Sequence, residues 1–251
     1  MLSLQIYLYT FSDKLSKVDG AVVITKCVTP DFNDAVIANK DKLVVHATCT
    51  GYGGSVLEPN VPPPHEQFQA VMALVKDGRF PKEKVTIRVD PIIPTPKGIK
   101  TAEGVIKMFM DVGFSRFRVS IIDMYPHVRE RFKQAGLPLI YGESGFSPSK
   151  AQVSAVDEML KSVSEYWKSL IDRELFADVL RIESCAEPGL TNVIPCGCVS
   201  DYDLELLGLT EDSAANNAGY QRPNCLCYSG KTELLKSNSR CRHGCLYCFW
   251  K

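Results

Sequence analysis

Val85-Thr86-Ile87-Arg88-Val89 is a short β-branched run of the kind that forms a buried strand. Similar runs lie on either side of it, at Ala21–Thr25, Leu43–Thr48, Phe117–Ile122 and Val179–Ile182. Between these runs, apolar residues recur at helical spacing in His65–Lys76, Thr101–Val112 and Ala151–Leu170. Strands that alternate with helices of this length indicate βα units and a parallel sheet. The predicted fold class is therefore α/β, as a partial or complete TIM-barrel-like parallel (β/α) barrel.

The pattern changes at about Gly189, after which turn residues and cysteines dominate and one short helix is expected near Asp203–Leu207. We therefore expect a barrel-like domain over residues 1–188 and a cysteine-rich iron–sulfur tail over residues 189–251 that folds back onto the barrel. A loop-rich segment of this length exceeds ordinary connections. Metal ligation is the available device to hold it in place.

Composition places few limits on function. Lys+Arg and Asp+Glu both number 29, which argues mildly against long duplex DNA and leaves binding of other nucleic acids open. No apolar run approaches the length of a membrane span, and the N-terminal residues do not form a signal peptide. We expect a cytoplasmic protein with no membrane partner.

The cysteines cluster in the last quarter of the chain. There are 10 in all, of which Cys27 and Cys49 are isolated. The other eight are Cys185, Cys196, Cys198, Cys225, Cys227, Cys241, Cys245 and Cys248. Without a signal peptide, such clustering favours metal binding over a disulfide framework.

Cys241, Cys245 and Cys248 form a CxxxCxxC motif. Three thiolates can hold three irons of a four-iron four-sulfur cluster and leave the fourth iron open for chemistry, whereas structural zinc and electron-transfer clusters usually have four protein ligands. The motif therefore predicts a reactive cluster. The alternative is a zinc knuckle completed by a distant cysteine or by His243.

The remaining clustered cysteines provide a second candidate site. Cys185, Cys196, Cys198, Cys225 and Cys227 offer five sulfurs, enough for an auxiliary iron–sulfur cluster or for zinc. The alternative is that they are buried thiols that pack as small apolar side chains.

Polar residues follow several of the predicted strands. Arg88 and Asp90 end one strand, Asp123 and Glu187 follow two others, and Glu58 lies in a loop after a Gly-rich stretch. Ligands of parallel barrels meet the carboxyl ends of the strands, so these five residues are the catalytic candidates. The alternative is that each forms a salt bridge at the rim of the barrel. Gly53 and Gly54 follow another strand, where they form either a ligand-binding loop or a plain turn.

Cys-x-His-Gly-Cys-x-Tyr-Cys closely resembles the cluster motif of radical S-adenosylmethionine (SAM) enzymes, in particular the spore photoproduct lyase-like branch. In those enzymes the motif lies near the N-terminus, whereas here it lies near the C-terminus, an order that resembles the DUF1848 family. The matching stretches are Leu57–Pro62, Arg88–Ile92, Ser120–Tyr125, Cys185–Glu187 and Gln221–Cys227. The resemblance extends from about Val18 onward.

The resemblance implies one site-differentiated cluster, cleavage of SAM and formation of a 5′-deoxyadenosyl radical. It also implies that Gly53 and Gly54 bind SAM, that Tyr247 packs beside its adenine, and that a ferredoxin or flavodoxin donates the electron. The substrate is a small molecule, with a nucleobase or nucleotide favoured by analogy. Two other functions stay open: a non-catalytic iron–sulfur electron carrier or redox sensor, and a zinc-stabilised binding protein.

The sequence departs from the family pattern in two places. A Ser-Arg-Arg-Thr-Asp-like stretch is not present, so we expect one wall of the site to be missing or supplied differently. The usual Thr-Lys-Asn-Pro is Thr25-Lys26-Cys27-Val28, and no role is carried over for that loop.

Overall fold

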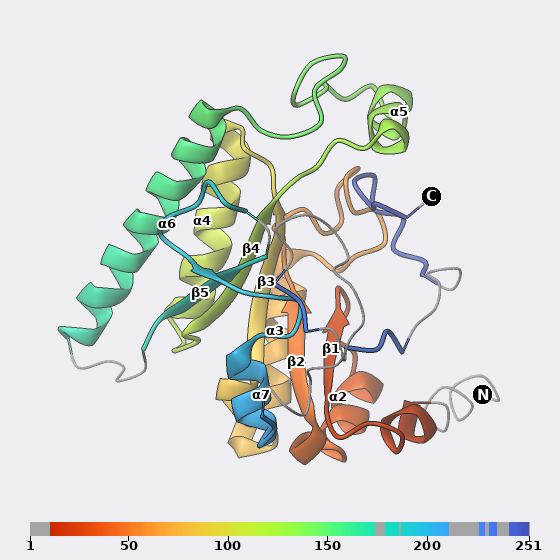
Figure 1. Ribbon diagram of the computed structural model, residues 1–251, viewed down its shortest axis with the longest axis vertical. Helices are drawn as coiled ribbons and strands as arrows, with labels where there is room; N and C mark the ends of the chain where they lie inside the picture. The colour runs from red at the N-terminus through yellow and green to blue at the C-terminus, as the bar shows by residue number, and fades with distance from the viewer. Residues whose placement is uncertain are drawn as a thin grey trace.

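A computed structural model describes residues 11–173, 179–185, 187–210, 226–228, 231–234 and 241–250. Its strands form one parallel sheet in the order β1-β2-β3-β4-β5-β6, so that each strand lies beside the next one along the chain (Figure 1). Their bounds are β1 Ala21–Thr25, β2 Leu43–Thr48, β3 Val85–Ile92, β4 Arg116–Ile121, β5 Arg181–Ser184 and β6 Ile194–Pro195. Within the described residues the sheet is open, with β1 and β6 as its edges.

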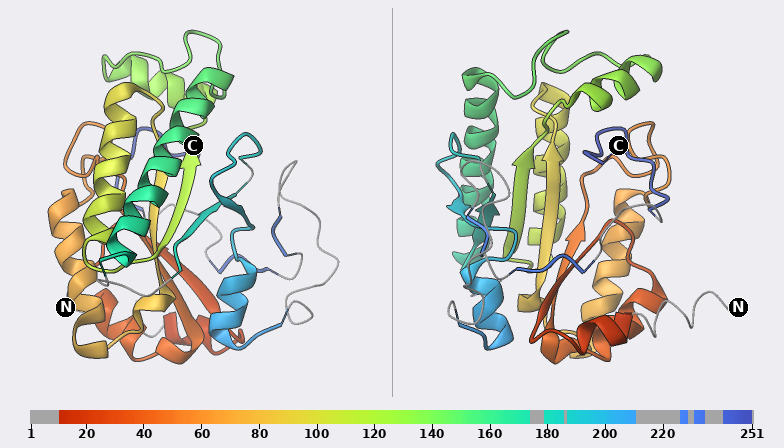
Figure 2. Two further views of the ribbon diagram at one scale, coloured as in Figure 1. Left: turned by 90° about the vertical axis from the view of Figure 1, so that its left-hand side faces the viewer. Right: turned by 45° about the vertical axis from the view of Figure 1, so that its right-hand side comes forward.

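The helices are α2 Pro30–Ile37, α3 Pro64–Val75, α4 Pro96–Met110, α5 Pro126–Gln134, α6 Lys150–Ile171 and α7 Asp201–Leu207. Several begin where the sequence offers a cap. Thr29 and Thr95 each accept a hydrogen bond from a backbone amide of the first turn, and a proline follows directly. Ser149 forms a capping box with Gln152 at the start of α6. Helices α4 and α6 lie side by side on one face of the sheet (Figures 1 and 2).

The main hydrophobic core lies between that face of the sheet and its helices. Alternate residues of the central strands, such as Ile87, Val89 and Phe117, are buried in it. Phe109 of α4 and Trp167 of α6 pack against the same core, each at most 1% exposed. The period of two along each strand thus directs the apolar residues to the helices and the intervening residues to the opposite face.

The opposite face of the sheet is polar and carries a buried ionic network. Arg116 Nη2 donates to Asp203 Oδ1 of α7 at 2.7 Å, and Arg118 Nη2 donates to Glu183 Oε2 at 2.8 Å. His46 Nε2 lies 3.4 Å from Asp203. Burial lowers the pKa of His46 to about 3, against the effect of Asp203. The imidazole is therefore neutral, and the two arginines provide the positive charge of the network.

The α/β class and the parallel sheet are confirmed, whereas a complete barrel is not formed by the described residues. The predicted strands are found with boundaries shifted by at most a few residues, and β3 continues to Ile92. Helices α2 and α5 and strand β6 were not predicted. Strand β6 and helix α7 lie beyond residue 188. Strand β6 pairs with β5, and helix α7 contacts β2. Among the described helices, none combines the length and the apolar character needed to cross a membrane.

Candidate metal and cofactor site

Strand register aligns polar residues of four neighbouring strands across the polar face. Thr48 pairs with Arg88, Arg88 with Arg118, and Arg118 with Glu183. Because every strand runs in the same direction, the residues beyond this row lie along one carboxyl edge of the sheet. That edge is where open and closed parallel α/β proteins bind their ligands.

Glu58 is the centre of a buried group at the carboxyl edge, here called the edge cluster, with Lys26, Thr50 and Tyr247. Its carboxylate is 1% exposed and accepts from Thr50 Oγ1 at 2.7 Å and from Lys26 Nζ at 2.9 Å. The Tyr247 hydroxyl also donates to it. Lys26 Nζ lies 2.9 Å from the same hydroxyl and 3.4 Å from the carbonyl oxygen of Asp90. The cluster therefore joins the ends of β1 and β3 to the cysteine motif.

Backbone hydrogen bonds hold the cysteine motif on the loop that follows β2. Leu246 N donates to Leu57 O at 3.0 Å, and Asn60 N donates to His243 O at 3.3 Å. The side-chain amide of Asn60 also donates to Arg242 O at 2.9 Å. The right-hand view of Figure 2 shows the C-terminal segment beside this loop. His243 thus lies against Asn60, with Nδ1 3.3 Å from its carbonyl oxygen.

Arg131 of α5 holds the other side of the motif. Its two terminal nitrogens donate to Cys248 O at 2.7 Å and to Trp250 O at 2.8 Å. Gly244 has φ +65°, a left-handed conformation that favours glycine, and Cβ at this position would lie 3.4 Å from the Asn60 amide. The motif is therefore fixed between α5 and the loop after β2.

The three motif cysteines differ in exposure. Cys241 is exposed, Cys248 is half-buried and Cys245 is buried in a small apolar cluster with Tyr247. Burial raises the pKa of Cys245 to about 11; the charge of Lys26 opposes this shift, whereas the charges of Glu58 and the other two motif cysteines add to it. A bound metal would reverse this, because it deprotonates a coordinating thiol. Within the described residues, the three motif sulfurs do not form a set in which all lie within 4.8 Å of one another.

Arg88, Asp90 and Ser120 form a second polar group on the same face. Arg88 and Ser120 both donate to the Asp90 carboxylate. Burial raises the pKa of Asp90, but the charge of Arg88 and these hydrogen bonds outweigh it and lower the pKa to about 2. Asp90 is therefore ionised and Arg88 is its ion-pair partner, as in the salt-bridge alternative.

The charges of Asp123 and Glu187 both act on Tyr141. Burial raises the pKa of Tyr141 strongly, and both carboxylates act in the same direction. Glu187 Oε1 accepts from Ile121 N at 3.0 Å, and the Tyr141 hydroxyl donates to Ile122 O at 2.7 Å. These two carboxylates sit at the end of β4, whereas Glu58 sits at the end of β2.

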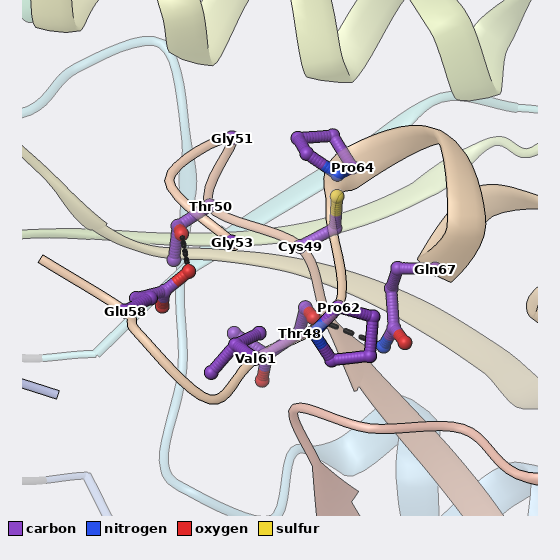
Figure 3. A pocket seen from close by; sticks show the side chains of 10 residues that line it. All are labelled: Thr48, Cys49, Thr50, Gly51, Gly53, Glu58, Val61, Pro62, Pro64 and Gln67. Carbon is purple, nitrogen blue, oxygen red and sulfur yellow. Dashed lines mark hydrogen bonds between the residues drawn. The ribbon is translucent and has the colours of Figure 1, made fainter. Parts of the chain in front are cut away.

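The Gly-rich stretch has a steric reason for its composition. Cβ at Gly53 would lie 1.9 Å from the carbonyl oxygen of Pro62, and Gly54 has φ +75°. Gly54 N donates to Glu58 O at 3.1 Å. Gly53 and Pro62 both line a small pocket, and Figure 3 shows the hydrogen bond from Thr50 to Glu58 beside it. The stretch thus forms the turn that buries Glu58.

The second cysteine group is partly assembled. Cys185, Cys198 and Cys227 place their sulfurs within 4.8 Å of one another. A hydrogen bond with Cys185 lowers the pKa of Cys198 to about 5. Cys196 is buried outside this group, and burial raises its pKa to about 11. Cys225 lies outside the described residues.

Lys26 and the ionic network around Asp203 were missed by the sequence reasoning. Lys26 directly follows β1, in the stretch that departs from the family pattern, and that position at a strand end was the available signal. Asp203 lies in a short helix far along the chain, and nothing in its local sequence pairs it with Arg116 or Arg118.

Together these features define an α/β protein with an open parallel sheet and a cysteine-rich site at the carboxyl edge of that sheet. A family model, Domain of unknown function (DUF1848), matches residues 5–250, and the chain belongs to this family. No curated protein matches the sequence significantly. A probable tagatose 6 phosphate kinase from Sinorhizobium meliloti 1021 is similar in structure, with a TM-score of 0.40 and 18% identity. The match covers 67% of this chain and 39% of the kinase chain.

Proposed function

We propose that this protein is a radical SAM enzyme in which Cys241, Cys245 and Cys248 hold a four-iron four-sulfur cluster with one iron open to SAM. The observation that carries the proposal is the docking of the motif at the carboxyl edge, where Tyr247 contacts Glu58 and Lys26. A metal that served only to hold the tail would not need this contact with buried ionic side chains. In this proposal the open sheet is an opened-out (β/α) barrel, since its strand order is sequential.

When bound, the cluster and SAM supply the electron and the carbon–sulfur bond whose cleavage gives a 5′-deoxyadenosyl radical. The residues of the chain bind and orient SAM and the substrate, and they exclude water. In this proposal a carboxylate ligand shares the Lys26 ammonium with Glu58 or the Arg88 guanidinium with Asp90. The Asp123 and Glu187 carboxylates are the acceptors suited to an ammonium or a ribose hydroxyl, and Tyr247 provides an aromatic surface beside the motif.

The proposal names only a class of substrate. The likeness of the motif to that of the spore photoproduct lyase-like branch favours a nucleobase or nucleotide, by analogy alone. The proposed reaction also requires an electron donor, such as a ferredoxin or flavodoxin, to reduce the cluster. Of the five residues named from the sequence, Glu58 is buried by its own partners and Arg88 and Asp90 pair with each other, so Asp123 and Glu187 are the first candidates for contact with the substrate.

Anaerobic reconstitution tests the proposal. The full chain is loaded with iron and sulfide, reduced with dithionite and incubated with SAM, and 5′-deoxyadenosine is measured by chromatography and mass spectrometry. We expect the product from the unsubstituted chain and from Cys27→Ala. We expect neither the product nor the visible iron–sulfur absorbance from Cys245→Ala.

Two results would favour the other functions. A fully formed cluster that undergoes reversible reduction without yielding 5′-deoxyadenosine would indicate an electron carrier or redox sensor. Stoichiometric zinc at the motif, together with no bound iron after reconstitution, would indicate a zinc-stabilised binding protein.

A further inference from the structure

Three cysteines from three separate parts of the chain meet on the polar face of the sheet. Cys185 directly follows β5, Cys198 precedes α7, and Cys227 belongs to the short segment 226–228. Their sulfurs all lie within 4.8 Å of one another. This group is distinct from Cys241, Cys245 and Cys248, which form no equally close set within the described residues.

The backbone around these cysteines is arranged for close approach. Cβ at Gly197 would lie 2.6 Å from the carbonyl oxygen of Leu226 and 2.8 Å from Cα of Cys227, so only glycine allows the two segments to touch. Cys198 N donates to the sulfur of Cys227 at 3.1 Å. Such an N–H···S contact stabilises a thiolate. The backbone, rather than contact between the thiols alone, therefore brings the three sulfurs together.

Three cationic side chains lie near the group, and each of them also has a carboxylate partner. Arg118 donates to the carbonyl oxygen of Cys198 at 2.7 Å. The Lys231 ammonium lies close enough to interact with the charges of Cys198 and Cys227, and the Arg88 charge also reaches Cys198. Three thiolates around a divalent ion carry a net charge of about −1, which these cations, each shared with a carboxylate, offset in part.

We propose that Cys185, Cys198 and Cys227 bind a single zinc ion, with a water molecule as the fourth ligand, and that this ion links the segment 226–228 to the end of β5. Two sulfurs bound tetrahedrally at about 2.3 Å from one zinc lie about 3.8 Å apart, which the spacing of the three sulfurs accommodates. Sulfurs bound to different irons of a four-iron cluster stand farther apart. The spacing therefore favours one ion over an auxiliary iron–sulfur cluster. Binding releases the thiol protons and changes no oxidation state.

The metal content of a variant without the first motif tests the proposal separately from the proposed enzyme function. The starting chain is the full sequence with Cys241→Ala, Cys245→Ala and Cys248→Ala, purified without oxygen. Mass spectrometry of the metals should find about one zinc per chain, as a folded three-thiolate site requires. Adding Cys198→Ala should lower zinc affinity by at least about 100-fold, the upper range for losing even an outer partner of a metal ligand. Adding Cys27→Ala should not change it.

Two further measurements cover the possibility that Cys198→Ala fails to fold. Cobalt(II) added to the zinc-free starting chain should give thiolate-to-cobalt charge-transfer bands and the intense visible bands of a tetrahedral site. In the starting chain, Cys227→His keeps a zinc-binding atom and should retain more zinc than Cys227→Ala.

Three results would overturn the proposal. One is iron with iron–sulfur absorbance in the starting chain after reconstitution, which would indicate an auxiliary cluster. Another is the loss of two titratable thiols that Cys198→Ala reverses, which would indicate a disulfide. The last is the weak spectrum of octahedral cobalt in the starting chain.

Discussion

Replacing Glu58 with glutamine should loosen the whole cysteine motif, because the Glu58 carboxylate accepts hydrogen bonds from Lys26, Thr50 and Tyr247 at once. The glutamine amide keeps the shape of the carboxylate but loses its charge and one acceptor. The amide nitrogen would then face donors, and the Lys26 ammonium would lose its ion-pair partner. A buried donor without an acceptor is costly.

The structure sets the size of the effect. Breaking a fully buried ion pair costs about 3–5 kcal/mol. The Lys26 side chain is 21% exposed and can partly rehydrate, so we expect Glu58→Gln to lower the free energy of unfolding by about 2–4 kcal/mol. Adding Lys26→Met should recover part of this loss, because it removes the charge left unpaired.

Urea unfolding of the metal-free chain measures the loss, and hydrogen exchange of residues 241–250 locates it. The matched control is Glu143→Gln, since the ion pair of Glu143 with Lys133 is exposed and should contribute at most about 1 kcal/mol. A loss below about 0.5 kcal/mol for Glu58→Gln, or unchanged exchange in the motif, would refute the view that the edge cluster anchors the motif.

Three other predictions follow from the same structure. Gly53→Ala should lower the free energy of unfolding by about 2–4 kcal/mol, because Cβ would lie 1.9 Å from the backbone of Pro62. Gly104→Ala has open space around it inside α4 and should raise the free energy of unfolding by about 0.5–1 kcal/mol. Equal effects of the two variants in urea titrations would contradict the steric explanation. His46, neutral when folded with a pKa of about 3, takes up a proton near pH 6.5 when unfolded, so the free energy of unfolding should fall by up to about 1.4 kcal/mol per unit as pH drops from 6.5 toward 3. A matching decline in His46→Gln would assign that pH dependence to other groups. A lysine at position 131 cannot reach both carbonyl oxygens of the motif that Arg131 binds. Limited proteolysis of Arg131→Lys within residues 246–250 should therefore be several-fold faster, which corresponds to about 1 kcal/mol of local opening free energy. An unchanged rate would show that Arg131 does not hold the motif in place.

The strands could be predicted from the sequence because each is a short run rich in apolar and β-branched residues. Leu43–Thr48 is buried along its whole length, and such a run has one interpretation. Helix α5 could not be predicted in the same way. It buries only Val128 and Phe132, so its apolar pattern is too sparse to identify. An open and a closed sheet share one local pattern, because closure depends on contacts between distant strands.

The candidate site was predictable to the extent that it depends on strand ends. Glu58 and Asp123 follow parallel strands and Asp90 lies in the last part of β3, and the topology places such residues at one edge. The partners that neutralise them were not predictable. Lys26 and Tyr247 meet although they are 221 positions apart, and no local period carries that information. The same limit explains why five clustered cysteines could be named but the close set of three could not be selected among them.

The docking of the cysteine motif on the loop after β2 also bears on how the protein is made. Synthesis proceeds from the N-terminus, and 189 positions separate Glu58 from Tyr247, so the ribosome completes β1 to β4 long before it reaches the motif. The nascent sheet can therefore fold with Glu58 and Lys26 already paired, and the motif arrives at a finished surface. If the motif binds a metal as proposed, the metal enters a site whose supporting sheet has already folded.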